Sequence, residues 1–274
     1  MKDHVKKLVG SLFHRVSAAA PLQDASPLLA LVNPKDLLPQ QALARLGTKY
    51  GGWIIPADAA LGPDSICYLA GAGEDISFDC ALVKQFGCKA RIVDPTPRAI
   101  EHFRQLSEAV RAGNRFPVNN STTDFYDLTP EQLARLTFLP VGLASQDVEL
   151  KFYMPKDPSH VSCSTANLQK TDNYFVAQCH RLSTLMAQQG DTHIDLMKMD
   201  IEGGEYDVIS DLASAGPLPR ILLIEFDETH VPQDAGALGR IGKHIGMLVD
   251  AGMRCIAAEG SNITLVRRTE NSHG

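Results

Sequence analysis

The segment at residues 194–205, IDLMKMDIEGGE, constrains the fold more than any other part of the chain. Its first half is apolar at nearly every position, which is typical of a parallel strand covered on both faces of its sheet. The strand nevertheless contains Lys198 and ends in Asp200 and Glu202. Buried charges are costly unless they are paired or functional. Because ligands of open α/β sheets bind beyond the carboxyl ends of the strands, the two carboxylates predict a site at that edge.

The composition fits one large α/β domain. The chain has 274 residues, of which 44% are hydrophobic, and its net charge of -6 without long Lys/Arg runs argues against nucleic acid as a partner. The six cysteines are scattered and form no CxxC pair, so we expect reduced thiols and no structural zinc. We find neither a signal-peptide pattern nor an apolar run of the roughly 20 residues that a membrane span needs. We therefore expect a cytoplasmic protein.

A repeating strand–helix pattern begins at Ser65. The apolar strand Ile66–Ala70 precedes Gly71 and Gly73, a helical pattern follows, and a second strand ends at Asp94. This spacing is typical of a βαβ unit with a right-handed crossover. Similar alternation continues almost to the end of the chain. We therefore predict an α/β fold with about seven core strands, all parallel except the last, and interleaved helices.

The residues before this core predict an appendage. Residues 5–16 place apolar side chains on one face of a helix, which we expect to dock on its own domain or on a second copy in a homo-oligomer. Attachment to an anionic membrane surface is the alternative, for which one short helix with few basic residues is a weak anchor. Residues 18–39 predict a linker or arm, residues 37–46 a short helix, and residues 51–56 a turn and a strand over the domain edge.

Between the core strands, residues 148–153 and 174–179 each predict an edge strand or hairpin. The polar stretch at 156–171 is a candidate lid over a substrate. The chain thus divides into an N-terminal helix and arm (1–64), an α/β domain (65–268) and a disordered tail (269–274).

The loop from Gly71 to Asp75 favours a cationic ligand over a dinucleotide. A dinucleotide fingerprint requires a third glycine where this chain has Ile76, and a loop that tolerates pyrophosphate. Glu74 and Asp75, at the start of the helix, would repel phosphate. S-adenosylmethionine (SAM) carries a sulfonium and an ammonium group but no phosphate, so it suits this loop. Asp94 is placed to accept hydrogen bonds from ribose hydroxyls, or alternatively to act as a cap or in an ion pair.

Three segments together resemble the FkbM-type SAM-dependent methyltransferases: YLAGAGEDISF at 68–78, VDPTP at 93–97 and IDLMKMDIEGGE at 194–205. The sequence IEF at 224–226 also fits. The resemblance spans roughly residues 65 to 268. It implies a class I methyltransferase, or Rossmann-like, fold with a seven-stranded, mostly parallel sheet and helices on both faces. It also implies SAM as the methyl donor and, usually, an oxygen atom as the acceptor.

The same resemblance implies that Gly71, Gly73 and Asp94 hold SAM. Many class I enzymes carry an acidic residue two positions before the first glycine, where this chain has Leu69. Asp75 is therefore the candidate for the contact with the methionine end of SAM.

Methyl transfer is an in-line displacement at a sulfonium carbon, in which alignment matters most, and a hydroxyl acceptor must also lose its proton to a base. The candidate bases are Asp200, Glu202, His230 and His160. Asp200 ends the strand beside the glycine loop, so we expect it nearest the methyl group. Glu202 has an alternative role in orienting the turn backbone, and His230 in capping. Lys198 is expected to pair with a carboxylate.

The same region offers ligands for a divalent cation such as Mg²⁺, namely Asp200, Glu202, Asp227, Glu228 and His230. Their spacing matches no strong metal motif, so we expect no metal. Two rival functions are an NAD-type oxidoreductase, which Ile76 and the loop acids disfavour, and a non-catalytic scaffold that retains the fold. We predict a SAM-dependent O-methyltransferase that acts on a small-molecule or glycan acceptor, a saccharide or a secondary metabolite.

Overall fold

The computed structural model describes residues 26–154, 163 and 171–268. The helix predicted at 5–16, the candidate base His160 and the tail at 269–274 lie outside these residues.

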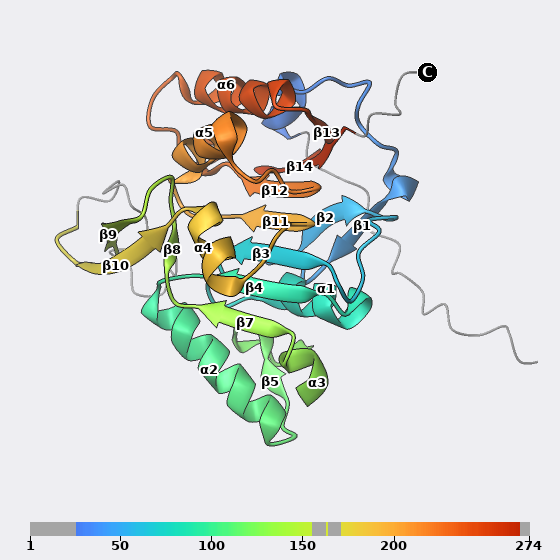
Figure 1. Cartoon of the computed structure of the whole chain (residues 1–274), viewed down its shortest axis with the longest axis vertical. Coiled ribbons are helices and arrows are strands. Elements are labelled where there is room, and N and C mark those ends of the chain that lie inside the picture. Colours follow the sequence, from blue (N-terminus) through green and yellow to red (C-terminus); the bar gives the residue numbers. More distant parts are fainter. Residues whose placement is uncertain (1–25, 155–162, 164–170, 269–274) are drawn as a thin grey trace, which may run out of the picture.

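The centre of the molecule is a seven-stranded sheet with the order β13-β14-β12-β11-β3-β4-β7 (Figure 1). β14 alone runs opposite to the other six strands, so the predicted direction of the strands is confirmed. The strands are β3 (Ile66–Ala70), β4 (Lys89–Val93), β7 (Leu136–Leu139), β11 (Leu196–Met199), β12 (Ile221–Glu225), β13 (Met253–Glu259) and β14 (Asn262–Arg267).

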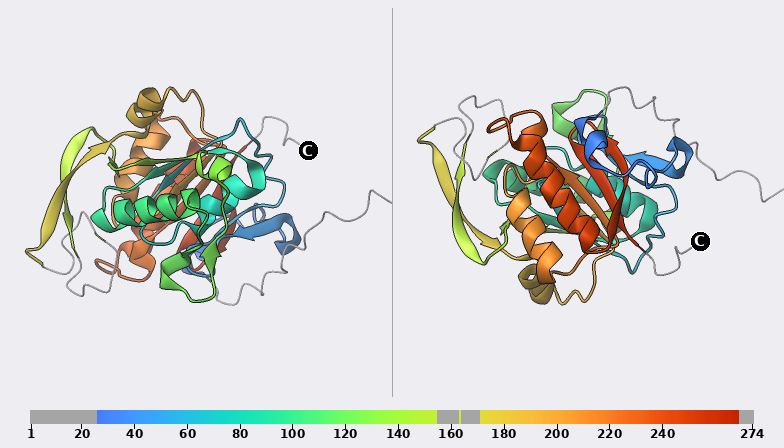
Figure 2. Two further views of the ribbon diagram at one scale, coloured as in Figure 1. Left: turned by 90° about the horizontal axis from the view of Figure 1, so that it is seen from below. Right: turned by 90° about the horizontal axis from the view of Figure 1, so that it is seen from above.

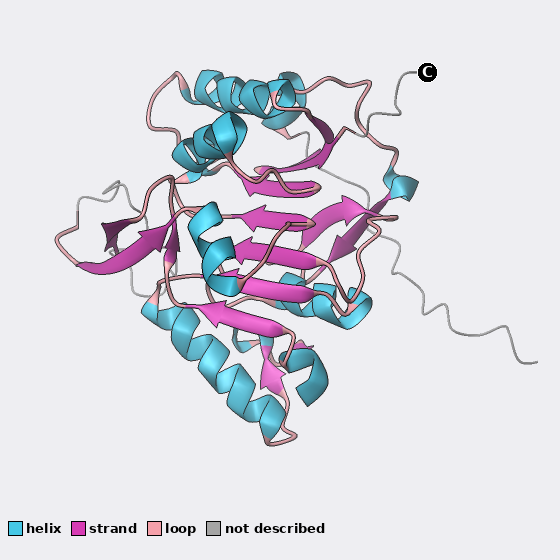
Figure 3. Cartoon of the chain, in the orientation of Figure 1, coloured by secondary structure: helices cyan, strands magenta, loops and turns pink. Residues whose placement is uncertain are grey.

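Helices cover both faces of this sheet (Figures 2 and 3). Side chains of one strand alternate between two cores, so Leu69 packs with α1 and α2 and Tyr68 packs with α4, α5 and α6. This arrangement confirms the predicted class I methyltransferase architecture. The helices are α1 (Ser77–Phe86), α2 (Pro97–Arg111) and α3 (Pro130–Leu133) on one face, and α4 (Leu182–Gln189), α5 (Glu205–Ala215) and α6 (Ala237–Asp250) on the other.

The helix boundaries follow the local sequence. Helix α1 ends at Gly87, whose φ of 67° is a left-handed conformation that glycine adopts without steric cost. Helix α2 begins with Thr96, whose side chain accepts a hydrogen bond from the amide of Ala99. These contacts place the start of α2 directly after the end of β4.

The predicted edge strands form a separate three-stranded sheet of β8 (Gly142–Leu143), β9 (Val148–Tyr153) and β10 (Tyr174–His180). Strand β10 pairs with β9 in antiparallel and with β8 in parallel direction. This arm projects from the side of the molecule where the parallel strands end (Figure 1). It therefore stands beside the predicted site.

A hairpin of β1 (Leu43–Leu46) and β2 (Trp53–Pro56) precedes the core. The helix predicted at 37–46 is wrong, because only the short 3-10 turn Gln40–Ala42 forms before β1 begins. Tertiary contacts decide the outcome: Trp53 and Ile55 are buried, and the Thr264 hydroxyl donates a 2.7 Å hydrogen bond to the carbonyl of Ile54. The smaller elements are η1 (Pro27–Leu31), β5 (Phe116–Pro117), η3 (Val118–Asn120), β6 (Phe125–Tyr126) and η4 (Asp227–Thr229).

Candidate active site

A cavity of about 1270 Å³ lies at the carboxyl ends of the central strands. Its walls come from distant parts of the chain: the β1–β2 hairpin, the arm strands β8 and β9, the β13–β14 turn, and the segments that follow β3, β4, β11 and β12. The structure thus brings all eight predicted site residues to one cavity edge, namely Gly71, Gly73, Asp75, Asp94, Lys198, Asp200, Glu202 and His230.

The glycine loop needs its glycines for two different reasons. Gly71 has a φ of 82°, and a Cβ atom there would lie 1.7 Å from the carbonyl oxygen of Asp200. Gly73 has a φ of 52° with open space around it, so its requirement is conformational alone. The loop therefore lies against the end of β11, which brings the backbone around Asp200 directly beside it.

Asp94 fastens the loop to the end of β4. One carboxylate oxygen accepts hydrogen bonds from the amides of Ala72 (2.8 Å) and Gly73 (3.0 Å). The other accepts from the amide (2.7 Å) and the hydroxyl (2.6 Å) of Thr96. A carboxylate has about four acceptor positions, so the chain itself occupies them. Asp94 is 4% exposed, and contact with a ribose stays a prediction.

The two loop acids have partners within the chain. Glu74 forms a 2.5 Å ion pair with Arg98 of α2. Asp75 accepts a 2.9 Å hydrogen bond from the amide of Ser77 at the start of α1, and a 2.7 Å bond from the Thr48 hydroxyl of the hairpin. Asp75 therefore links the hairpin to the loop, and its contact with the methionine end of SAM stays a prediction.

Lys198 is buried beneath the loop, with 4% of its surface exposed. Its ammonium group donates a hydrogen bond to the carbonyl of Gly71 and lies 3.9 Å from a carboxylate oxygen of Asp200. The expected pairing with a carboxylate agrees with this position. Lys198 also lowers the pKa of buried Asp79, although burial prevails and raises that pKa to about 6. These contacts give Lys198 a positioning role between loop and strand.

Carboxyl groups gather on the other side of Asp200. Oxygen atoms of Asp200, Glu202 and Asp227 lie within 4.8 Å of one another and could together hold a metal ion. Burial, and then the neighbouring carboxylates, raise the pKa of Glu225 to about 8 and that of Asp227 to about 9. Burial also raises the pKa of Asp200. Asp200, Glu202, Glu225 and Asp227 are called the acid cluster below. Their carboxyl groups either retain protons or attract a cationic ligand.

The turn after β11 is organised by Glu205, which sequence reasoning missed. Its carboxylate accepts hydrogen bonds from the amides of Ile201 (3.2 Å) and Gly203 (3.0 Å). Glu205 thus orients this turn, and the same alternative role for Glu202 stays a prediction. Glu202 has a φ of 55°, and its carboxylate joins the acid cluster. The sequence signal for this role was the position of Glu205 at the start of a helix, where a carboxylate is favourable.

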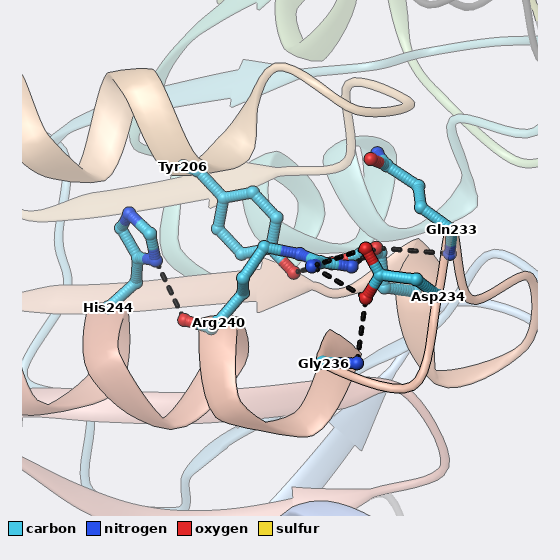
Figure 4. A network of polar contacts seen from close by, with 7 residues as sticks. Tyr206, Gln233, Asp234, Gly236, Arg240 and His244 are labelled. Atoms are coloured by element: carbon cyan, nitrogen blue, oxygen red, sulfur yellow. Dashed lines mark hydrogen bonds and ion pairs between the residues drawn. The ribbon is translucent and has the colours of Figure 1, made fainter.

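A polar network holds the segment that follows β12 (Figure 4). Glu228 is buried, bonded at 2.6 Å to the Tyr206 hydroxyl and at 2.5 Å to Arg240, which also reaches Asp234 at 2.8 Å. Glu228 is thus committed to this network and lies outside the acid cluster, contrary to its inclusion among the metal ligands. His230 is exposed at the cavity edge, two residues beyond Glu228.

The hairpin supplies aromatic cavity walls that the sequence did not indicate. Trp53 is 3% exposed, with its ring 5.7 Å from the Lys198 ammonium, whereas Tyr50 at the hairpin tip is 75% exposed. Although most of its surface is exposed, partial desolvation of the hydroxyl and then the charge of Asp200 raise the pKa of Tyr50. The glycines around Tyr50 mark a turn, but nothing in the local pattern shows where the turn docks.

The chain is similar to known proteins in sequence and in structure. A sequence model described as "Methyltransferase FkbM domain" matches residues 70–255. Precorrin-6y C5,15-methyltransferase from Geobacter metallireducens aligns over 76% of this chain and 81% of its own, with 10% identity and a TM-score of 0.38. A mutant of MtNAS aligns over 77% of this chain and 56% of its own, with 7% identity and a TM-score of 0.36. No curated protein matches.

Both TM-scores lie below 0.5, so the fold assignment rests on the strand order and the domain match. Within the described part of the chain, no helix has the length and apolar character needed to cross a bilayer.

Proposed function

Because this chain belongs to the methyltransferase FkbM domain family, we propose that it transfers a methyl group from SAM to a hydroxyl oxygen of a saccharide or secondary metabolite. The observation that carries the proposal is the charge around the glycine loop. Eight Asp and Glu residues but only three Lys and Arg residues are among the described residues that line the cavity, and two of the three cations have partners in the chain: Lys198 donates to the Gly71 carbonyl and Arg45 pairs with Glu259. A sulfonium suits such a cavity better than a diphosphate does.

The residues that would hold SAM are the loop glycines Gly71 and Gly73, Asp94 behind them and Asp75 beside them. When bound, SAM supplies an activated methyl group. The cavity of about 1270 Å³ leaves room for an acceptor next to the end of β11. Holding two reactants in one enclosed space is the main source of rate enhancement in such a displacement.

We assign the role of general base to Asp200, with Glu202 and His230 as the other candidates. Asp200 lies beside the loop, and its pKa is raised by burial, so its carboxylate accepts a proton more readily than an exposed one. Lys198, 3.9 Å away, holds it in place and favours its charged form. We therefore expect the acceptor hydroxyl to lie within hydrogen-bond reach of Asp200.

A metal-assisted reaction is a second candidate, supported by the convergence of Asp200, Glu202 and Asp227. Three carboxylates are a ligand set that Mg²⁺ accepts. We expect turnover without a metal, so EDTA should leave the rate unchanged. Loss of activity in EDTA that Mg²⁺ restores would instead assign these three residues as ligands.

Calorimetry with SAM and with NAD tests the choice of ligand. We expect heat of binding from SAM alone, whereas binding of NAD alone would support the oxidoreductase alternative. Formation of S-adenosylhomocysteine with a panel of saccharides and hydroxylated metabolites then tests catalysis. Tight binding of SAM without turnover on any member of the panel would favour the scaffold alternative.

A further inference from the structure

Two buried side chains hold the glycine loop from the side opposite the cavity. Tyr126, in β6, is 5% exposed and His102, in α2, is 9% exposed. The Tyr126 hydroxyl oxygen accepts a 3.0 Å hydrogen bond from the amide of Ile76 and lies 2.9 Å from Nε2 of His102. Ile76 is the N-cap of α1 and has no capping side-chain bond of its own. The phenol of Tyr126 thus satisfies a buried amide where the loop becomes a helix.

The distances around the Tyr126 hydroxyl favour a neutral His102. The amide of Ile76 can only donate, so the single proton of the Tyr126 hydroxyl points elsewhere. Nε2 of His102 at 2.9 Å is a better acceptor position than the carbonyl of Glu74 at 3.5 Å. The shorter bond forms when Nε2 accepts, and this arrangement uses a neutral imidazole with its proton on Nδ1. An imidazolium would reverse this bond and leave the hydroxyl proton to the Glu74 carbonyl at 3.5 Å.

We propose that Tyr126 and His102 are positioning residues for the glycine loop, and that SAM binding weakens when the His102 imidazole takes up a proton. This inference rests on the proposed binding of SAM by the loop. The pair lies outside the cavity, so its effect must pass through the backbone of residues 73–76. Protonation turns Nε2 into a donor, so the Tyr126 hydroxyl can no longer donate to it and has to turn towards the Glu74 carbonyl, which pulls on the loop itself.

The surroundings of His102 allow a proton to reach it. A second cavity, of about 250 Å³, is lined by His102 together with Glu74, Arg98 and Glu101. Burial lowers the pKa of His102, while the charges of Glu74 and Asp75 oppose that effect. Arg98 is paired with Glu74 and offsets part of its charge. The transition therefore falls on the acid side of the ordinary histidine value of about 6.5.

The test is a calorimetric titration of the full chain with SAM between about pH 5 and pH 8, with three variants. Tyr126→Phe removes the acceptor for the Ile76 amide, and we expect its Kd for SAM to rise about 5- to 10-fold at neutral pH. His102→Gln retains an acceptor that cannot take up a proton, so its affinity should match wild type at neutral pH and fall less in acid.

Tyr68→Phe is the matched control. Tyr68 is also a buried tyrosine, but its hydroxyl donates a 2.8 Å bond to Asp191 on the opposite face of the sheet. We expect it to lose stability without a change in Kd. The acid cluster contributes its own pH dependence in all variants, so the difference between the wild-type and His102→Gln profiles isolates His102.

Superimposable pH profiles for wild type and His102→Gln, or an unchanged Kd in Tyr126→Phe, would overturn the proposal. If the wild type binds no SAM, the proposed function fails, and the positioning role is then decided by amide hydrogen exchange at residues 73–76. Tyr126→Phe should speed that exchange about 10-fold while Tyr68→Phe leaves it unchanged, and equal rates in both variants would refute the role.

Discussion

At the scale of single residues, the Asp94 side chain connects the glycine loop to the start of α2. Its oxygens hold the loop through Ala72 and Gly73, and the start of α2 through Thr96. Loss of the carboxylate leaves buried amides without partners, which costs more than the bonds themselves contribute. The effect on SAM is therefore expected even if the ribose makes no direct contact with Asp94.

We expect Asp94→Ala to weaken SAM binding by about 1.5–3 kcal/mol and to lower the free energy of unfolding by a similar amount. Calorimetry and urea denaturation measure the two effects. Asp124→Ala, in an exposed turn, is the control and should change neither. An unchanged SAM affinity in Asp94→Ala would contradict the role of this residue in the donor site.

Asp200 is expected to act on chemistry more than on binding. Asp200→Asn keeps the size of the side chain but removes the proton acceptor, so kcat should fall by about 10²-fold or more while the Kd for SAM changes little. Asp207→Asn, which removes an exposed carboxylate at the rim of the same cavity, should retain activity. Full turnover by Asp200→Asn would transfer the role of base to Glu202 or His230.

At the scale of elements, the β1–β2 hairpin connects the cavity wall to the loop. Thr48 in the hairpin turn donates to Asp75, and Thr264 of β14 donates to the carbonyl of Ile54 in β2. Each bond fixes the same hairpin, but only the first reaches the residues that would surround SAM. The two threonines therefore separate hairpin stability from loop geometry.

We expect Thr48→Val to raise the Kd for SAM several-fold, because Asp75 loses one of its two bonds within the chain. Thr264→Val removes one hydrogen bond of about 1 kcal/mol, so it should lower the melting temperature yet leave the Kd unchanged. Thr48→Val also removes the bonds that the Thr48 hydroxyl accepts from the Gly51 amide and the Ser77 hydroxyl, so it should lower the melting temperature further. SAM titrations and thermal scans of both variants provide the comparison. Equal effects on Kd would mean that the hairpin acts as a whole.

The sequence predicted the elements whose signals are local. The strand before Gly71, the cap at Thr96 and the stop at Gly87 each depend on neighbours within a few residues. The hairpin and the partners of the loop could not be read in this way. Tyr126 reaches Ile76 across 50 positions, and the bonds from the Ile201 and Gly203 amides to Glu205 depend on a backbone turn that periodicity does not encode.

At the scale of the whole molecule, the acid cluster couples stability to pH. Carboxyl groups in an unfolded chain have pKa values near 4, whereas Glu225 and Asp227 have values of about 8 and about 9. Between these limits the folded protein holds protons that the unfolded chain has released. The free energy of unfolding contributed by these groups is therefore lost as the pH rises through that range.

We accordingly expect a lower melting temperature at about pH 9 than at about pH 7, and a smaller difference in Asp227→Asn. A bound sulfonium favours the ionised carboxylates, so SAM should protect more strongly at the higher pH and should release protons on binding. Calorimetry in two buffers of different ionisation enthalpy counts these protons. Proton uptake on binding, or a melting temperature that rises towards pH 9, would contradict this account.

The arm of β8, β9 and β10 is hydrogen-bonded as a sheet of its own and contributes Val148, Leu150 and Phe152 to the cavity wall. Such an appendage can diverge without disturbing the strands that carry the glycine loop and Asp200. Substitutions in the arm would therefore alter the wall beside the proposed acceptor and leave the residues proposed to bind SAM in place. Family members that differ in the arm would then differ in the molecules that they modify.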